Sequence, residues 1–191
     1  MSTAPSSPAT SSEFGTLSEE HWIEPLNDGS HVLIRPLKPE DRQREADFIA
    51  GLSAEARHFR FLCSMREVSP ALLDQLMAVN FKDSVAYIAV AHQDGKLIEV
   101  GVSRYAVGGD GEQCECAITV ADAWRHRGLA VALMRHLIET ARRNGLKQMF
   151  SLDSAANTGM HELVRFLGFT TRQDPNDATQ VIHTLSLQPG A

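Results

Sequence analysis

Apolar and polar residues follow two periods along the chain, and together they predict a single mixed α/β domain. Short apolar runs bounded by turn residues predict strands, and longer stretches with apolar residues three and four apart predict helices. The predicted strands are His31–Pro36, Val85–Ala91, Leu97–Val107, Glu112–Val120, Gln148–Asp153, Phe169–Arg172 and Gln180–Leu187. The predicted helices are Pro39–Leu52, a short helix capped by Ser53, Ser69–Ala78, Leu129–Asn144 and Thr158–Leu167.

The order of these elements predicts the topology of the sheet. Tight turns at Asp94-Gly95 and Gly108–Gly111 join three strands into an antiparallel meander. The strand–helix–strand unit after Glu112 implies a parallel crossover. We therefore expect an α/β (α+β) fold with a mixed, mostly antiparallel sheet, helices on both faces and one parallel strand pair.

The N-terminal segment differs from the rest of the chain. Residues 1–25 are rich in Ser, Thr, Ala and Pro and have no hydrophobic period, so they are expected to be a disordered tail before a domain spanning 26–191. The longest apolar run, Val85–Ala91, is too short to cross a membrane, and no secretory signal is visible. A cytoplasmic protein without a membrane partner is expected.

Composition narrows the function classes. The 191 residues carry a formal net charge of −6, which argues against nucleic acid as the main partner. The three cysteines, Cys63, Cys114 and Cys116, have no disulfide or metal-ligand spacing, and no His-Glu-x-x-His motif occurs. Cys114 and Cys116 share one face of a strand and are expected to pack in the core, and no metal is expected.

The segment Val120–Ala130 predicts an anion-binding site. A strand ends at Val120, an arginine-rich loop follows, and Gly128 permits a tight turn into the next helix. Free backbone N–H groups at a helix N-terminus favour a phosphate or pyrophosphate. Arg125 and Arg127 add charge-assisted donors.

Three motifs in this region resemble the GCN5-related N-acetyltransferases (GNAT). Arg125-x-x-Gly128-x-Ala130 is similar to the family's acetyl-CoA pyrophosphate loop, and the strand Glu115–Val120 precedes it as in the family. The segment Asn157-x-x-Met160-x-x-Leu163, followed by Phe166-Leu-Gly-Phe169, matches a downstream family segment. The resemblance implies the GNAT fold, with the parallel strand pair at the cofactor cleft.

An N-terminal segment resembles one group within this family. Ile34-Arg-Pro-Leu-Lys-Pro-Glu-Asp41 and Arg57-x-x-Arg60-Phe61 are similar to the acetyltransferase domain of bacterial Pat-type protein-lysine acetyltransferases. The resemblance covers about Asp28 to Leu187. The 191 residues contain no counterpart of the large ligase-like regulatory domain that many Pat enzymes carry.

The resemblance implies acetyl-CoA as co-substrate and assigns residues to it. Loop amides would hold the pyrophosphate, backbone groups of the strand would pair with pantetheine, and a backbone amide near Ile118 would receive the oxyanion. Asn157 would reach the pantetheine or the 3′-phospho-ADP. The cofactor-binding residues expected are Ile118, Thr119, Val120, Arg125, His126, Arg127, Gly128, Leu129, Ala130 and Asn157. His126 is equally compatible with a solvated loop position.

Glu115 is the candidate general base. A carboxylate inside an apolar strand is costly to bury unless it is paired or functional. A lysine amine with a pKa of about 10.4 must lose a proton before it attacks. The alternative is that Glu115 points to solvent or pairs with an arginine, and Glu112 is a weaker candidate. Val164 occupies the position where many family members have a tyrosine acid, so no general acid is assigned.

Three functions fit these observations. The first is transfer of acetyl from acetyl-CoA to a protein lysine, with an acyl-CoA synthetase as the substrate that the resemblance suggests. The second is acetylation of a small-molecule amine or a protein N-terminus, and the third is a non-catalytic acyl-CoA sensor. Arg57 and Arg60 either line the substrate side or join a core ion pair. A monomer or homodimer is expected.

Overall fold

The computed structural model describes residues 20–62 and 68–188. The strands are β1 (Trp22–Pro25), β2 (His31–Pro36), β3 (Ser84–Gln93), β4 (Lys96–Val107), β5 (Gln113–Val120), β6 (Gln148–Ser154), β7 (Thr170–Gln173) and β8 (Gln180–Ser186). The helices are α1 (Arg42–Gly51), α2 (Ala54–Phe61), α3 (Pro70–Met77), α4 (Leu129–Arg143) and α5 (Thr158–Phe166). Short 3₁₀ turns at Pro39–Asp41 and Asp122–Trp124 precede α1 and the loop before α4.

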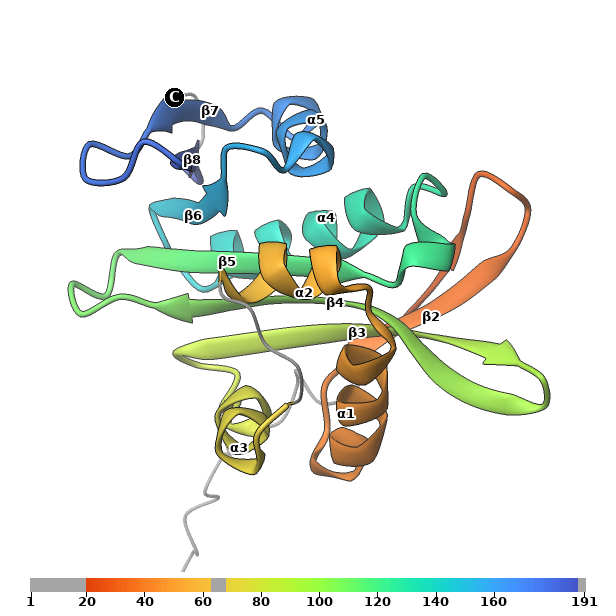
Figure 1. Cartoon of the computed structure of the whole chain (residues 1–191). Coiled ribbons are helices and arrows are strands. Elements are labelled where there is room, and N and C mark those ends of the chain that lie inside the picture. The colour runs from red at the N-terminus through yellow and green to blue at the C-terminus, as the bar shows by residue number, and fades with distance from the viewer. Residues whose placement is uncertain (1–19, 63–67, 189–191) are drawn as a thin grey trace, which may run out of the picture.

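The strands form one sheet in the order β1-β2-β3-β4-β5-β6-β8-β7 (Figure 1). The meander β3-β4-β5 is antiparallel, and β5 and β6 form the parallel pair on either side of the α4 crossover. The other neighbouring strands of the sheet are antiparallel. The predicted mixed, mostly antiparallel sheet with one parallel pair is therefore confirmed.

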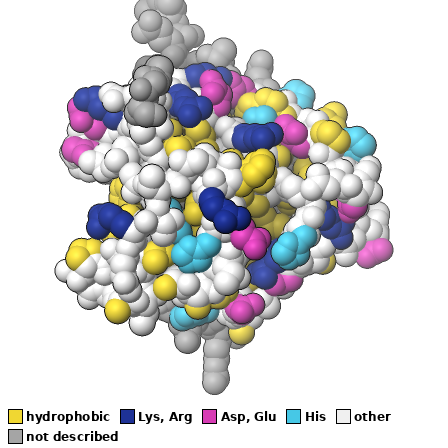
Figure 2. Space-filling view, turned by 90° about the horizontal axis from the view of Figure 1, so that it is seen from above, with side chains coloured by type: hydrophobic (Ala, Val, Ile, Leu, Met, Phe, Trp, Pro, Cys, Tyr) yellow, Lys and Arg dark blue, Asp and Glu magenta, His cyan; other side chains and the backbone are white. Residues whose placement is uncertain are grey.

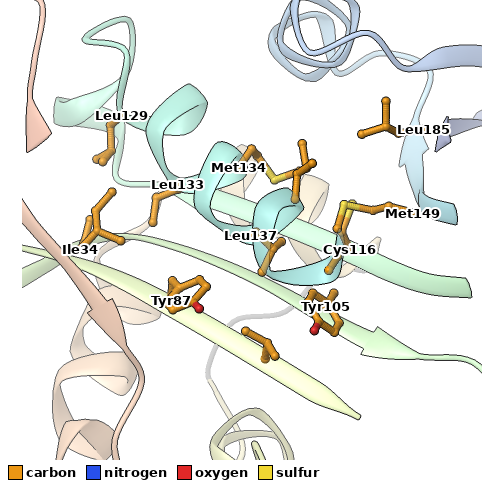
Figure 3. Close-up of a cluster of buried hydrophobic side chains, with 14 of the residues drawn as sticks. Ile34, Tyr87, Tyr105, Cys116, Leu129, Leu133, Met134, Leu137, Met149 and Leu185 are labelled. Carbon is orange, nitrogen blue, oxygen red and sulfur yellow. The ribbon is translucent and has the colours of Figure 1, made fainter. Parts of the chain in front are cut away.

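Two hydrophobic cores cover the two faces of the sheet. Along β3, Tyr87 and Ala89 face the core that contains α4, whereas Ile88 and Val90 face the core that contains α1, α2 and α3. This alternation follows from the period of two in a strand. Figure 3 shows the first core, where side chains of α4 such as Leu133 meet Tyr87 and its neighbours.

Polar side chains begin the helices next to the site. The Ser53 hydroxyl accepts a hydrogen bond from the Ala56 N–H at 3.1 Å, so its predicted role as the N-cap of α2 is confirmed. The backbone N–H and the hydroxyl of Ser53 also donate to the Asp122 carboxylate, each at 3.0 Å. The start of α2 is thus tied to the loop that precedes α4.

The predicted boundary of the disordered tail, at residue 25, is wrong because the ordered domain begins earlier. Residues 1–19 lie outside the described residues, but Trp22–Pro25 pair with β2 as an edge strand. The Trp22 ring stacks on His136 of α4, with 3.9 Å between ring centroids, and Glu24 contacts the same imidazole at 2.7 Å. The sequence does not predict this strand, because it is short and its apolar residue Ile23 is 70% exposed instead of buried.

Buried charges lie between β4 and α1. Glu45 pairs with Arg104 at 2.6 Å, and Asp41 accepts from Arg35 and from Arg44. Glu99 is buried beside them, and its carboxylate oxygens have no hydrogen-bond partner among the described residues. Burial, followed by the negative charge of Glu45, holds the pKa of Glu99 well above its ordinary value.

The cysteines follow the expected packing where the structure describes them. Cys114 and Cys116 are both buried and free, while Cys63 lies outside the described residues. Over residues 20–62 and 68–188, no helix is long and apolar enough to span a membrane.

Candidate active site

The site lies where β5 and β6 separate. These strands pair only through Gln113↔Gln148, Cys114↔Met149 and Glu115↔Phe150, and beyond this point β5 pairs with β4 alone. The Ala121 N–H donates to Val100 of β4 at 2.9 Å. Because peptide groups alternate in direction along a strand, those of Ile118 and Val120 point toward the opening instead.

A cavity of about 770 Å³ occupies this opening. The end of β5, the loop before α4 and the start of α5 supply its walls. Nine of the ten residues predicted to bind the cofactor line it: Ile118, Thr119, Val120, Arg125, His126, Gly128, Leu129, Ala130 and Asn157. This volume lies in the range of about 300–1,000 Å³ that is usual for cofactor and small-molecule sites in proteins.

The loop before α4 turns through two left-handed residues. His126 has φ of 60°, and Gly128 has φ of 87° as the N-cap of α4. Glycine suits this position because it lacks the Cβ atom that disfavours positive φ. A Cβ at Gly128 would also lie 3.3 Å from side-chain atoms of Asn27. The first N–H groups of α4 have no acceptor within the helix, so they are available at the cavity wall.

The two loop arginines lie in different environments. Arg125 lines the cavity and pairs with Asp122 at 3.1 Å. Arg127 does not line the cavity: its guanidinium donates to Asp28 and to the Ala123 carbonyl, each at 2.7 Å, and lies 4.8 Å from the centre of the Trp124 ring. In this structure Arg127 therefore holds the loop against the turn that precedes β2.

Helix α5 forms the opposite wall. The Asn157 side-chain oxygen accepts the Met160 N–H at 3.2 Å and begins the helix. Phe166, near the end of the helix, lines the same cavity and is 66% exposed. Arg135 of α4 lies over its ring at 5.8 Å from the centroid. Sequence reasoning did not assign Phe166 to the site, although an exposed aromatic residue on a helix is a usable signal.

A second, smaller cavity of about 240 Å³ adjoins the first. Arg60, Ile118 and Met160 line both, and Glu115 and Asp153 line only the smaller one. Glu115 is exposed, so the prediction that its carboxylate is buried in the strand is wrong. The neighbouring cysteines of β5 point into the core, and the alternation of the strand turns Glu115 toward α2 and this cavity.

Asp153 is a site residue that sequence reasoning missed. It lies at the opening on β6, accepts a hydrogen bond from the Ser151 hydroxyl at 2.7 Å, and lies 3.9 Å from Nε2 of the buried His183. The other ring nitrogen of His183 contacts the Thr171 hydroxyl at 2.8 Å. Burial raises the pKa of Asp153 and lowers the pKa of His183. The sequence signal that could have identified Asp153 is its acidic side chain at the end of a strand predicted to lie inside the sheet.

The sequence leaves the roles of Arg57 and Arg60 undecided, and the structure shows that the two side chains have different environments. The Arg57 guanidinium donates to the backbone carbonyls of Ala50 and Leu52, at 3.1 and 2.8 Å, and joins the end of α1 to α2. Arg60, one turn later, lines both cavities.

No tyrosine is available at the site. The chain contains two tyrosines, Tyr87 and Tyr105, and both are buried in the core with hydroxyls that contact Thr140 and Asn144. Val164, at the position expected from sequence to hold a tyrosine in many relatives, is buried in α5. Among the described residues, no group of three or more His, Cys, Asp or Glu side chains is arranged to hold a metal ion.

The face seen in Figure 2 carries α5 and β7. Acidic and basic side chains are mixed across it, with histidine and apolar side chains between them. This face therefore has no large area of a single charge sign.

Comparison with known proteins identifies the family. The family model described as "Acetyltransferase (GNAT) family" matches residues 52–169. "Acetyltransferase PA5475" of Pseudomonas aeruginosa is 56% identical over 177 residues, which cover 93% of this chain and 95% of the relative. The chain belongs to the GNAT family. It is an acyl-CoA-dependent N-acetyltransferase, and acetyl-CoA is the cofactor that this family uses.

Solved structures share the fold of this GNAT domain. The GNAT domain of S. lividans PAT matches with a TM-score of 0.78 at 24% identity, over 87% of this chain and 96% of that domain. The protein yncA from Salmonella typhimurium, solved with its cofactor acetyl-CoA, matches with a TM-score of 0.67 at 18% identity, over 85% of this chain and 97% of that one. The predicted fold and the predicted family are both confirmed.

Proposed function

We propose that this enzyme transfers the acetyl group of acetyl-CoA to a lysine side-chain amine of a protein, by direct attack in a ternary complex. The observation that carries the proposal is the position of Glu115. It lines the smaller cavity at the last residue pair of the β5–β6 ladder, beside the opening that fits an extended cofactor.

The loop before α4 suits the pyrophosphate of acetyl-CoA. The N–H groups at the start of α4 and the helix dipole favour a negative group there. Arg125 adds a cation on the cavity wall, and the left-handed Gly128 lets the backbone approach closely. Arg127 contributes by fixing the loop through Asp28. His126 also lines this wall, where its imidazole can contact a phosphate.

The exposed edge of β5 suits the pantetheine arm. The peptide groups of Ile118 and Val120 face the opening, so the arm can pair with them as an added strand. Thr119 and Asn157 line the same cavity. This course brings the thioester next to Ile118, which lines both cavities, so that its backbone N–H can donate to the oxyanion of the tetrahedral intermediate.

Glu115 would act as the general base. A lysine ammonium transfers a proton to Glu115, directly or through a water, and the neutral amine attacks the thioester carbonyl. The C–N bond forms, the C–S bond breaks, and the second proton lost by the attacking nitrogen passes through solvent to the departing CoA thiolate. Because a thiol has a pKa of about 8.5, this leaving group does not require a tyrosine acid. The buried positions of Tyr87 and Tyr105 agree with this route.

Two features support a protein lysine as the acceptor. The segments Ile34–Asp41 and Arg57–Phe61 resemble Pat-type protein-lysine acetyltransferases, and the fold resembles the GNAT domain of S. lividans PAT. In addition, Glu115 is exposed and within reach of a long side chain that enters from solvent. An acyl-CoA synthetase is the substrate that the Pat resemblance suggests.

Mass spectrometry tests the acceptor class directly. The enzyme is incubated with a cell lysate and isotopically labelled acetyl-CoA, and labels are mapped to lysines, protein N-termini and small amines. We expect labelled lysines with wild-type enzyme and with Glu112→Gln, and a strong loss of labels with Glu115→Gln. Glu112 is a matched control because it is exposed, pairs with Lys147 and lines neither cavity.

Each contrary outcome identifies a different error. Labels confined to small amines or N-termini would refute the lysine acceptor and leave the acetyltransferase chemistry intact. Equal lysine labelling by wild-type enzyme and folded Glu115→Gln would refute the role of Glu115.

A further inference from the structure

Arg60 is a partly buried cation without an ion pair. Its guanidinium lies 4.9 Å from the centre of the Phe61 ring, and within residues 20–62 and 68–188 it has no hydrogen-bond or carboxylate partner. Other arginines set into the fold are paired: Arg35 with Asp41 and Arg104 with Glu45, both at 2.6 Å. An unpaired guanidinium that has lost water is costly, so its retention suggests a ligand.

The electrostatic environment of Arg60 supports this interpretation. Burial, followed by the positive charge of Arg104, lowers the pKa of Arg60 to about 10. The side chain remains charged at neutral pH. Glu45, Glu115 and Asp153 act in the opposite direction, but none of them forms an ion pair with Arg60. The cation is therefore partly desolvated, and the nearby carboxylates offset this only in part.

The smaller cavity contains charges of both signs. Glu115 and Asp153 supply carboxyl groups, Arg60 supplies the guanidinium, and Leu152 and Met160 add apolar walls. A primary ammonium is attracted by the carboxylates and repelled by Arg60. An acceptor that carries both an ammonium and an anion can place its ammonium near the carboxylates and its anion near Arg60, so that both contacts are attractive.

We propose that Arg60 binds a carboxylate of the acceptor, and that the preferred acceptor is a primary amine that carries a carboxylate within reach of Arg60. This inference rests on the proposed function of Glu115 as the base in the same cavity. The planar guanidinium matches a carboxylate through two parallel hydrogen bonds, which a lysine at this position would not reproduce. The carboxylate comes from an acidic residue beside the target lysine or from a free amino acid.

Steady-state kinetics with matched acceptors tests the proposal. One set contains blocked tetrapeptides in which lysine is flanked by Glu or by Gln, and the other contains ω-amino acids from glycine to 6-aminohexanoate with their amides. We expect a higher kcat/KM for the carboxylate member of at least one set, by roughly ten- to a hundredfold. The set that shows the preference identifies the source of the carboxylate, and the chain-length series reads the separation of amine and anion.

Three variants assign the preference to Arg60. Arg60→Gln is expected to abolish the preference by raising KM for the acidic acceptor, while KM for the matched uncharged acceptor does not rise. Arg60→Lys is expected to retain only part of it. Arg172→Gln on β7 is the control, because it removes the same charge from an exposed position that lines neither cavity.

The outcomes separate this inference from the proposed function. Acetylation of amines without a carboxylate preference, or a preference that survives in folded Arg60→Gln, would overturn the role of Arg60 alone. A rise in KM for acetyl-CoA with Arg60→Gln, at an unchanged acceptor KM, would assign Arg60 to the cofactor instead. Failure of wild-type enzyme to acetylate any amine would overturn the proposed function and this inference with it.

Discussion

Replacing Gly128 by alanine should weaken acetyl-CoA binding in addition to destabilising the fold. Gly128 has φ of +87° as the N-cap of α4, and a Cβ there would lie 3.3 Å from Asn27 side-chain atoms. A small shift of the exposed Asn27 side chain relieves this contact, but alanine still disfavours the positive φ, so we expect the loop backbone to relax and the amides at the start of α4 to shift with it.

The size of the effect follows from the conformation. A left-handed conformation costs a residue with a Cβ about 1–2 kcal/mol, and this strain should appear in the free energy of unfolding. Loss of alignment of two or three amides with a pyrophosphate should weaken binding roughly tenfold or more, since about 1.4 kcal/mol corresponds to a factor of ten.

Gly145→Ala is the matched control. Gly145 ends the same helix with φ of +77°, and no atom lies within 4 Å of a Cβ placed there. Urea unfolding should show similar destabilisation of both variants, and calorimetry should show weaker acetyl-CoA binding only for Gly128→Ala. Equal acetyl-CoA affinities for the two folded variants would refute the assignment of this loop to the pyrophosphate.

Three further predictions concern stability and the loop. The raised pKa of Glu99 keeps its carboxyl protonated in the fold, whereas the unfolded chain loses this proton above a pKa of about 4.3. The resulting contribution to stability is present below that pH and is lost as pH rises toward the raised folded pKa. Urea unfolding at pH 5 and 8 should show that the free energy of unfolding falls less with pH in Glu99→Gln than in wild type. Leu133→Ala should reduce the free energy of unfolding by about 2–5 kcal/mol, because the side chain is fully buried in the core beneath α4, and thermal or urea unfolding measures this. Asp122→Asn removes the charge that accepts from Ser53 and pairs with Arg125. Because these groups are largely exposed, it should cost about 0.5–1 kcal/mol in the same assay; an unchanged midpoint would contradict it.

Much of the fold can be predicted from the sequence because turn residues, helix caps and apolar periodicity indicate the same elements that the structure contains. The turn at Asp94-Gly95, the N-cap at Ser53 and the apolar stripe of Leu129–Asn144 each predict an element that the structure contains. β1 is not predictable in this way. Its exposed Ile23 breaks the expected pattern, and its stability depends on the distant contact between Trp22 and His136.

The site is less predictable because it depends on where two strands separate. Periodicity places Glu115 on a strand, but only the end of the β5–β6 ladder shows that its side chain is exposed at a cavity. The sequence likewise does not show that Arg127 contacts Asp28, whereas Arg60 has no such partner among residues 20–62 and 68–188. Asp153 reaches the site from a strand that lies far from Glu115 in sequence.

The turnover of Glu115→Gln at saturating acetyl-CoA tests the central claim most directly. With a lysine acceptor, kcat should fall by roughly 10²–10⁴-fold relative to wild type and to Glu112→Gln, while acetyl-CoA affinity and the unfolding midpoint stay unchanged. A folded Glu115→Gln enzyme with wild-type kcat would contradict the assignment of Glu115 as the base at the opening between β5 and β6.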